Sequence, residues 1–166
     1  MAEHRTFNIQ HSTLKHRASE AARSQSADVN KRKFDLEGRL LDFSSAIIDI
    51  SEALPKTRSG THVAGQLLRS GTSPYSNHGE AEAAESPDDF VHKLKICLKE
   101  LRETRRWLRL VERKLWLANE PLLSTALREV EELIRIFAVS IRTATRNRDS
   151  RGERRTADRP DLQTFP

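Results

Sequence analysis

The sequence predicts an all-α protein, an antiparallel up-down-up-down four-helix bundle with disordered tails at both ends. Three observations favour this fold class. Glycine and proline are scarce, at six each, apolar residues recur at spacings of three and four, and helix-capping signals separate the periodic segments. We expect the bundle to occupy residues 34–146, between an N-terminal tail at 1–33 and a C-terminal tail at 147–166.

The first two predicted helices differ in regularity. The helix from Phe34 to Leu54 carries one apolar stripe, and Pro55 ends it because the residue before a proline disfavours helical geometry. The second helix is expected from about residue 61 to 85. Pro74 lies inside it and removes a backbone donor, so we expect a kink or two short helices there. The stripe of the first helix consists of Leu36, Leu40, Phe43, Ile47, Ile50 and Leu54.

Capping residues predict where the third and fourth helices begin. Ser86 can cap free backbone donors, and Pro87 suits the first helical position. Asn119 and Pro121 repeat this pattern for the fourth helix, which we expect to end near Thr145. The third helix has a heptad-like apolar stripe of Phe90, Leu94, Cys97, Leu101, Thr104, Leu108, Val111 and Leu115. The stripe of the fourth helix is Leu123, Leu127, Val130, Ile134, Phe137 and Ile141.

Charge and hydropathy limit the possible locations and partners. The formal net charge is +5, and residues 1–33 supply most of it, with seven lysines and arginines against three acidic residues. A basic arm of this kind can bind phosphates or can be a solvated extension. The first thirty residues lack an apolar run, and no stretch is long enough to span a membrane. We therefore expect a cytoplasmic protein with no membrane association.

No pattern in the sequence predicts a catalytic or metal site. The Glu-x-x-His pairs of di-iron bundles do not occur. Ser73, His78 and Asp88 could be imagined as a triad, but helices of a bundle offer no obvious oxyanion hole. Cys97, the single cysteine, falls on the predicted core stripe, where a buried thiol is expected rather than a nucleophile. We expect no enzymatic activity, no metal and no cofactor.

The third helix also carries basic residues at intervals of about one turn. Glutamates interleave with them, so the face can be a solvated surface with ion pairs, a phosphate-binding strip or a subunit interface. As a phosphate-binding strip, it would act together with Lys31, Arg32 and Lys33, which precede the first helix. We call these third-helix residues the basic strip: Lys95, Lys99, Arg102, Arg106, Arg109 and Arg113.

Two further polar groups are interpreted as structural pairs. In a hairpin that turns near Ser86, Arg69 should face Glu100 or Glu103. Residues at equal distances from this turn lie opposite each other, which also places Glu80 near Lys93. Because Arg69 lies among apolar residues, we expect its pair to be buried, where removal of one partner is costly.

The segment between Gln66 and Leu108 resembles a known bacterial family. Its string QLLRSGTS at 66–73 is followed by Glu80-Ala81, Lys93-Leu94, LKEL at 98–101 and Trp107-Leu108. These residues resemble the bacterial four helix bundle proteins, which include proteins encoded in intervening sequences of 23S ribosomal RNA genes. The sequence is also similar to the accessory protein of diversity-generating retroelements. The resemblance implies a helical protomer, often a homopentamer, with nucleic-acid association in some members and no established enzymatic activity.

Two functions follow as hypotheses. The first is a non-catalytic, oligomeric bundle that binds RNA or DNA phosphates without strong sequence readout. The alternative is an oligomeric protein–protein scaffold or accessory protein with no nucleic-acid role. We expect self-association through the third and fourth helices, because Trp107 and Trp116 lie off the principal stripe and can contribute to an interface.

Overall fold

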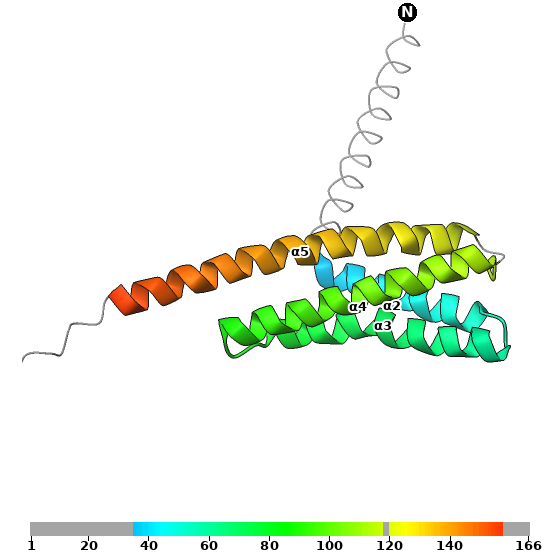
Figure 1. Ribbon diagram of the computed structural model, residues 1–166, viewed down its shortest axis with the longest axis horizontal. Helices are drawn as coiled ribbons and strands as arrows, with labels where there is room; N and C mark the ends of the chain where they lie inside the picture. The colour runs from blue at the N-terminus through cyan, green and yellow to red at the C-terminus, as the bar shows by residue number, and fades with distance from the viewer. Residues whose placement is uncertain (1–34, 118–119, 158–166) are drawn as a thin grey trace, which may run out of the picture. The chain divides into compact units, whose positions relative to one another are not determined.

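Four helices make up the described part of the chain. The structure, a computed structural model, describes residues 35–117 and 120–157. The helices are α2 (Leu36–Ala53), α3 (Arg58–Glu82), α4 (Pro87–Lys114) and α5 (Glu120–Ala157), and the described ranges contain no strand (Figure 1). The predicted all-α fold class is confirmed. Two compact units divide the chain between Arg39 and Leu40, so the helical bundle described below begins at Leu40.

Local capping explains where three of the helices begin. The Asp35 carboxylate accepts a hydrogen bond from the Gly38 amide at 2.9 Å. The Thr57 hydroxyl accepts one from the Gly60 amide at 3.1 Å, and the Ser86 hydroxyl accepts one from the Asp89 amide at the same distance. Each side chain satisfies a backbone donor that the first turn of a helix leaves free. The predicted start of the third helix at Ser86 is thus confirmed.

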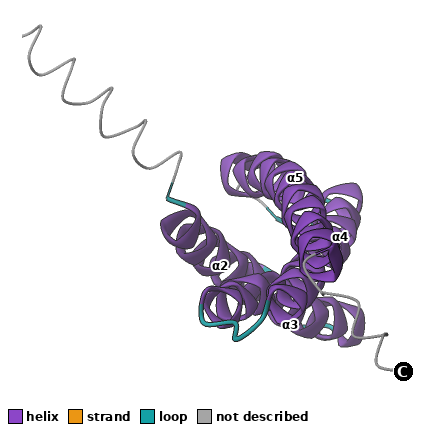
Figure 2. Ribbon diagram, turned by 90° about the vertical axis from the view of Figure 1, so that its left-hand side faces the viewer, coloured by secondary structure: helices purple, strands orange, loops and turns teal. Residues whose placement is uncertain are grey.

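Pairs of residues across the helices show that α3 and α4 run antiparallel, and that α4 and α5 do too. Between α3 and α4, contacts join residue 70 to 104 and residue 80 to 93, so the numbers rise on one helix as they fall on the other. Between α4 and α5, residue 105 pairs with 131 and residue 88 with 148, which gives the same relation. Figure 2 looks along the bundle and shows the helices around a common interior.

The core is built from the inward faces of all four helices. Ile47 of α2 packs against Gly71 of α3, where an added Cβ would lie only 2.5 Å from the Ile47 Cγ2 atom. At the centre of the α3–α4 contact, the Thr104 hydroxyl lies 3.1 Å from the Ser70 hydroxyl and 2.9 Å from the Glu100 carbonyl oxygen. The hydroxyls in the core therefore have partners, as buried polar groups require.

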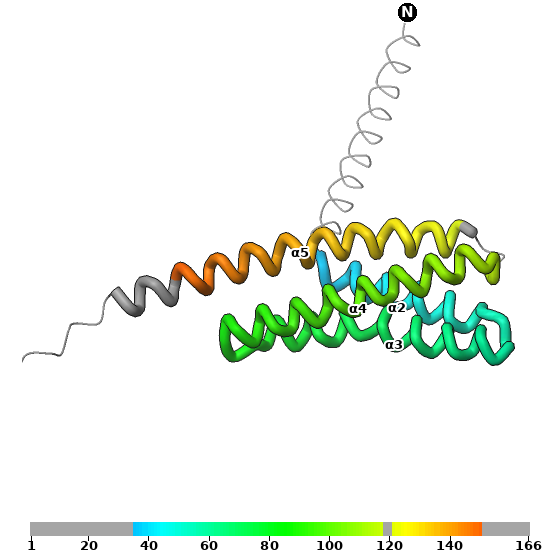
Figure 3. The backbone as a smooth tube through the Cα atoms, viewed as in Figure 1, coloured from blue at the N-terminus to red at the C-terminus, as the bar shows by residue number. Residues whose placement is uncertain are grey.

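Some predicted boundaries differ from the structure. Helix α3 runs without interruption through the buried Pro74, so the prediction of two short helices is wrong (Figure 3). It ends at Glu82 rather than near residue 85. Helix α5 continues to Ala157, twelve residues beyond the predicted end at Thr145, which places residues 147–157 in a helix rather than a tail. Apolar periodicity finds only the packed part of a helix, and polar residues continue α5 past it.

The predicted core stripes also need small corrections. Leu115 is 85% exposed and caps the end of α4 in the left-handed conformation, with φ of 52°. Val91 is buried in place of Phe90, which is half-buried. On α5 the fully buried positions include Ala126 and Leu133, while the predicted Leu127, Ile134 and Ile141 are half-buried. Asn119 and residues 1–34, including the predicted N-terminal tail, lie outside the described residues.

Candidate functional site

The outward side of α4 includes three rows of residues spaced seven apart, about 10.5 Å along the helix. Two of the rows are named after the helix that they contact. Glu103 contacts Arg69 of α3, so its row is called the α3-side row. Arg109 contacts Glu131 of α5, so its row is called the α5-side row. Between them is the outer row. The α3-side row is Ile96, Glu103 and Leu110, the outer row is Lys99, Arg106 and Arg113, and the α5-side row is Lys95, Arg102 and Arg109.

All six residues of the basic strip are exposed, and they occupy the outer and α5-side rows. Arg109 is engaged within the chain, because its Nη2 atom lies 3.3 Å from a Glu131 carboxylate oxygen. The other members, Lys95, Lys99, Arg102, Arg106 and Arg113, form no ion pair with side chains of residues 35–117 or 121–150. The structure therefore presents on one helix five cations that have no ion partner among the side chains it describes.

Two of the glutamates that interleave with the strip, Glu100 and Glu103, point toward α3, whereas Glu112 is exposed. Glu103 accepts a hydrogen bond from Arg69 Nη2 at 2.6 Å and one from Trp107 Nε1 at 3.4 Å. Glu100 is directed into the α3–α4 contact and is only 9% exposed. The carboxylates of Glu100 and Glu103 both lie against Arg69 of α3, so they do not form direct ion pairs with the strip.

The structure brings both predicted polar pairs of the α3–α4 hairpin together. Arg69 lies 2.6 Å from Glu103 and 3.6 Å from Glu100, and Lys93 donates a hydrogen bond to Glu80. That hydrogen bond, with the negative charge of Glu80, raises the pKa of Lys93. The expectation of a buried Arg69 is wrong, since its side chain is 58% exposed. Its aliphatic stem and guanidinium lie at the edge of the contact, where water screens the pair.

One ion-pair partner of the α4 arginines was not predicted from the sequence. Glu131 of α5 lies 3.2 Å from Arg105 and 3.3 Å from Arg109. In two antiparallel helices, residues at equal distances from the turn lie opposite each other. A turn near residue 118 would therefore have placed residue 131 opposite residue 105. Lys31, Arg32 and Lys33, the predicted basic arm, lie outside the described residues.

Cys97 is a buried thiol, as its position on the core stripe predicts. Its Sγ atom lies 3.5 Å from the Pro74 carbonyl oxygen, to which it can donate a hydrogen bond. Burial raises the pKa of the thiol to about 12, which keeps it protonated at neutral pH. The thiolate form that acts as a nucleophile or metal ligand is therefore strongly disfavoured. Among the described residues, no three His, Cys, Asp or Glu side chains group as metal ligands.

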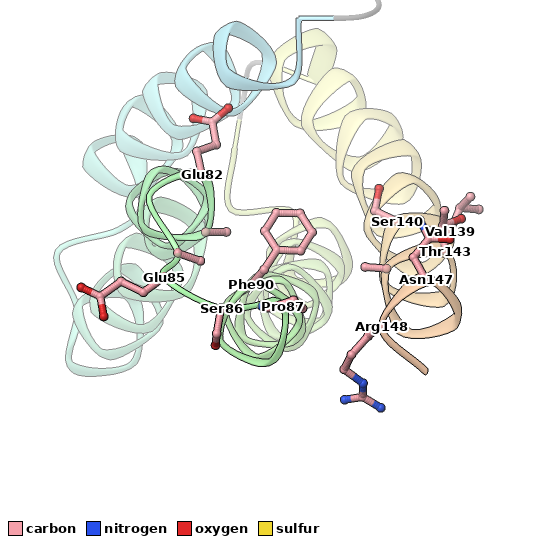
Figure 4. Close-up of a pocket in the computed structure, with 13 residues that line it drawn as sticks. Glu82, Glu85, Ser86, Pro87, Phe90, Val139, Ser140, Thr143, Asn147 and Arg148 are labelled. Atoms are coloured by element: carbon pink, nitrogen blue, oxygen red, sulfur yellow. The ribbon is translucent and has the colours of Figure 1, made fainter. Parts of the chain in front are cut away.

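A cavity of about 680 Å³ opens where the α3–α4 turn faces α5. Phe90 of α4 lines one side, and Val139, Ser140, Thr143 and Asn147 of α5 line the other (Figure 4). At the rim, Arg148 is paired with Asp88 at 3.0 Å. The lining combines an aromatic ring with hydroxyl and amide groups and with the carboxylates of Glu82 and Glu85. Its one arginine, Arg148, is paired with Asp88 and Asp149.

The described helices include none that is both long and apolar enough to cross a membrane.

Comparison with known proteins gives a consistent result. Residues 32–139 match the model of the family described as 23S rRNA-intervening sequence protein. The chain is also similar to the crystal structure of a protein of unknown function from the S23 ribosomal protein family of Bacteroides thetaiotaomicron, with 32% identity and a TM-score of 0.58. That match covers 63% of this chain and 96% of the other. Curated protein sequences contain no match to the chain.

Proposed function

Because the chain belongs to the 23S rRNA-intervening sequence protein family, we propose that it is a non-catalytic, oligomeric helical bundle that binds the phosphates of RNA or DNA. The observation that supports this proposal is the set of five exposed cations along α4 that have no ion partner among the described side chains. A cation that has no intramolecular partner can bind a phosphate without first breaking an ion pair. We place the protein in the cytoplasm, as the sequence predicts.

The arrangement favours phosphate contacts over reading of bases. The cations follow the length of one helix in two adjacent rows, which suits a repeating backbone charge. The ring of Trp107 is half-buried and forms a T-shaped contact with His62, with 6.2 Å between the ring centroids, so it is only partly accessible for base stacking. Binding should therefore be tolerant of sequence and steeply dependent on salt concentration.

The test is binding to a structured RNA and to duplex DNA across a salt series that starts at about 50 mM, where such contacts are strong. Joint replacement of Lys99, Arg102 and Arg106 by glutamine should weaken binding to all sequences alike. The dependence of log K on log salt should flatten by up to about three, because each phosphate contact contributes roughly 0.9 on B-DNA. Deletion of residues 1–33 should act in the same direction.

A matched control removes the same charge from another helix. Arg128, Arg135 and Arg142 are exposed on α5, and their joint replacement by glutamine lowers the net charge equally. The control should retain most of the affinity. Equal losses in the two triple variants would mean that net charge, not the strip, governs binding. Absence of binding at about 50 mM salt would reject the proposal, and the protein–protein scaffold would then be the better function.

A further inference from the structure

A hollow of about 730 Å³ lies on the outward side of α4, and all the side chains that line it belong to this helix. We call it the α4 hollow. Toward α3 it is apolar, because Leu110 is 38% exposed and the half-buried Trp107 lies one turn before it. Phosphate contacts do not account for this surface, since neither side chain carries a charge. Neighbouring exposed apolar groups mark a contact with a ligand that has apolar surface of its own.

Two contacts hold the Trp107 ring in place. Its Nε1 atom donates a hydrogen bond to Glu103 Oε1 at 3.4 Å, and the ring forms a T-shaped contact with His62 of α3. Glu103 is in turn held by Arg69 Nη2 at 2.6 Å. The part of the ring that lines the hollow therefore has a fixed orientation, which reduces the entropy lost when a ligand binds there.

Cations border the apolar side of the hollow. Lys99 and Arg106 line it and have no ion partner among the described side chains. They lie seven residues apart in the outer row, about 10.5 Å along the helix, and Leu110 follows Arg106 by one turn. Glu103 also lines the hollow, but its carboxylate already accepts a hydrogen bond from Arg69. The hollow thus combines anion-binding groups with an apolar surface.

This combination fits an unpaired nucleotide better than a duplex. A duplex stacks its bases inside the double helix and meets a basic strip with its phosphates and sugars, so Trp107 and Leu110 would stay uncovered. In a single strand the bases can turn away from the backbone and lie against aromatic or apolar side chains. Such contacts tolerate any sequence, because every base has a π-face.

We propose that the α4 hollow holds an unpaired base of a single strand, or of a loop or bulge in a folded RNA. Lys99 and Arg106 bind the phosphates beside this base. Because only part of the Trp107 ring is accessible, the base covers Leu110 and that part of the ring. This assignment rests on the proposed function and adds to it that strand form, rather than sequence, determines the affinity.

An abasic strand separates contacts with bases from contacts with phosphates. The full-length chain is titrated at one salt concentration with an oligothymidylate and with an abasic oligonucleotide of the same length. The wild type should bind the oligothymidylate at least about fivefold more tightly, the lower limit for one base against an aromatic side chain. A duplex that carries the same number of phosphates serves as the third ligand.

Leu110→Ser removes apolar surface from the hollow and leaves every charge in place. It should weaken binding of the oligothymidylate by about threefold or more, with binding of the abasic strand and of the duplex unchanged. The matched control is Leu68→Ser on α3, because Leu68 is 39% exposed and lies outside the hollow. The control should change none of the three affinities, and circular dichroism should show intact helices in both variants.

Fluorescence provides a direct readout of the contact. In the variant Trp116→Phe, Trp107 is the sole tryptophan. Oligothymidylate should quench its emission, because a base then lies against the ring, and the abasic strand should not.

The outcomes distinguish this site from the proposed function. Equal affinity for the oligothymidylate and the abasic strand, or an equal loss for all three ligands in Leu110→Ser, would overturn the base contact and leave phosphate binding intact. A change in the sedimentation of Leu110→Ser without nucleic acid would assign this leucine to a contact between copies and would also overturn it. Absence of binding to all three ligands would reject the proposed function as well.

Discussion

The inner and outer sides of the α3–α4 hairpin use the same residue types for different purposes. On the inner side, Leu101 is fully buried, Gly71 is packed against Ile47, and Arg69 at the edge is held by two carboxylates. On the outer side, Leu110 is exposed, Gly65 faces open space, and Arg106 has no ion partner among the described side chains. The two sides therefore provide matched pairs of leucines, glycines and arginines.

This contrast teaches that residue type alone does not assign a role on a bundle helix. The role follows from the row in which a residue lies, because one row meets a neighbouring helix and the next meets solvent. A residue that stabilises the single chain should be sensitive to substitution in the monomer. A residue kept for an external partner should not be, and three comparisons test this expectation in dilute, monomeric protein.

The leucine pair should show the largest difference. Leu101→Ala removes a fully buried side chain and leaves a cavity, so the free energy of unfolding should fall by about 2–5 kcal/mol. Leu110→Ala, on the exposed row, should change it by about 0.5 kcal/mol or less. Denaturant unfolding followed by circular dichroism measures both. Comparable losses would mean that Leu110 is part of the core of the single chain.

The glycine pair should differ in sign. At Gly71 an added methyl group would lie 2.5 Å from Ile47 Cγ2 and 2.8 Å from its Cγ1, so Gly71→Ala should destabilise by about 1–3 kcal/mol. Gly65→Ala meets no atom and should stabilise the helix by about 0.4–1 kcal/mol. Thermal unfolding of the two variants provides the measurement. Destabilisation by Gly65→Ala would show that its surroundings are filled within the chain.

The arginine pair should show the smallest difference. Arg69→Met removes the partner of Glu103 and Glu100, but the exposed guanidinium limits the loss to about 1 kcal/mol, below the 3–5 kcal/mol of a buried pair. Arg106→Met should leave the free energy of unfolding within about 0.5 kcal/mol of the wild type. Urea titrations resolve this difference. A loss above 3 kcal/mol at Arg69 would restore the buried-pair interpretation.

Much of the fold was accessible from local sequence. Apolar periodicity and caps predicted the four helices, and Ser86 with Pro87 gave the start of α4 to the residue. Register about that turn predicted which side chains of α3 and α4 meet, since antiparallel helices joined by a short turn have little freedom to slide. Local patterns could not show that α3 passes through Pro74 or that α5 continues to Ala157. Neither feature produces an apolar periodicity that could be detected in the sequence.

The sequence by itself determined the helical bundle, its antiparallel order and the presence of a basic strip on α4, because spacing and capping are local properties of the chain. Only the tertiary structure decided which charged side chains already have an ion-pair partner within the chain. It pairs Arg109 with Glu131, turns Glu103 toward Arg69, and leaves Lys99 and Arg106 without ion partners among the described side chains. It also distinguishes Gly65 from Gly71, which differ only in what lies opposite them. The physical reason is that pairing and burial depend on the neighbouring helix, whose distance and rotation no local pattern encodes.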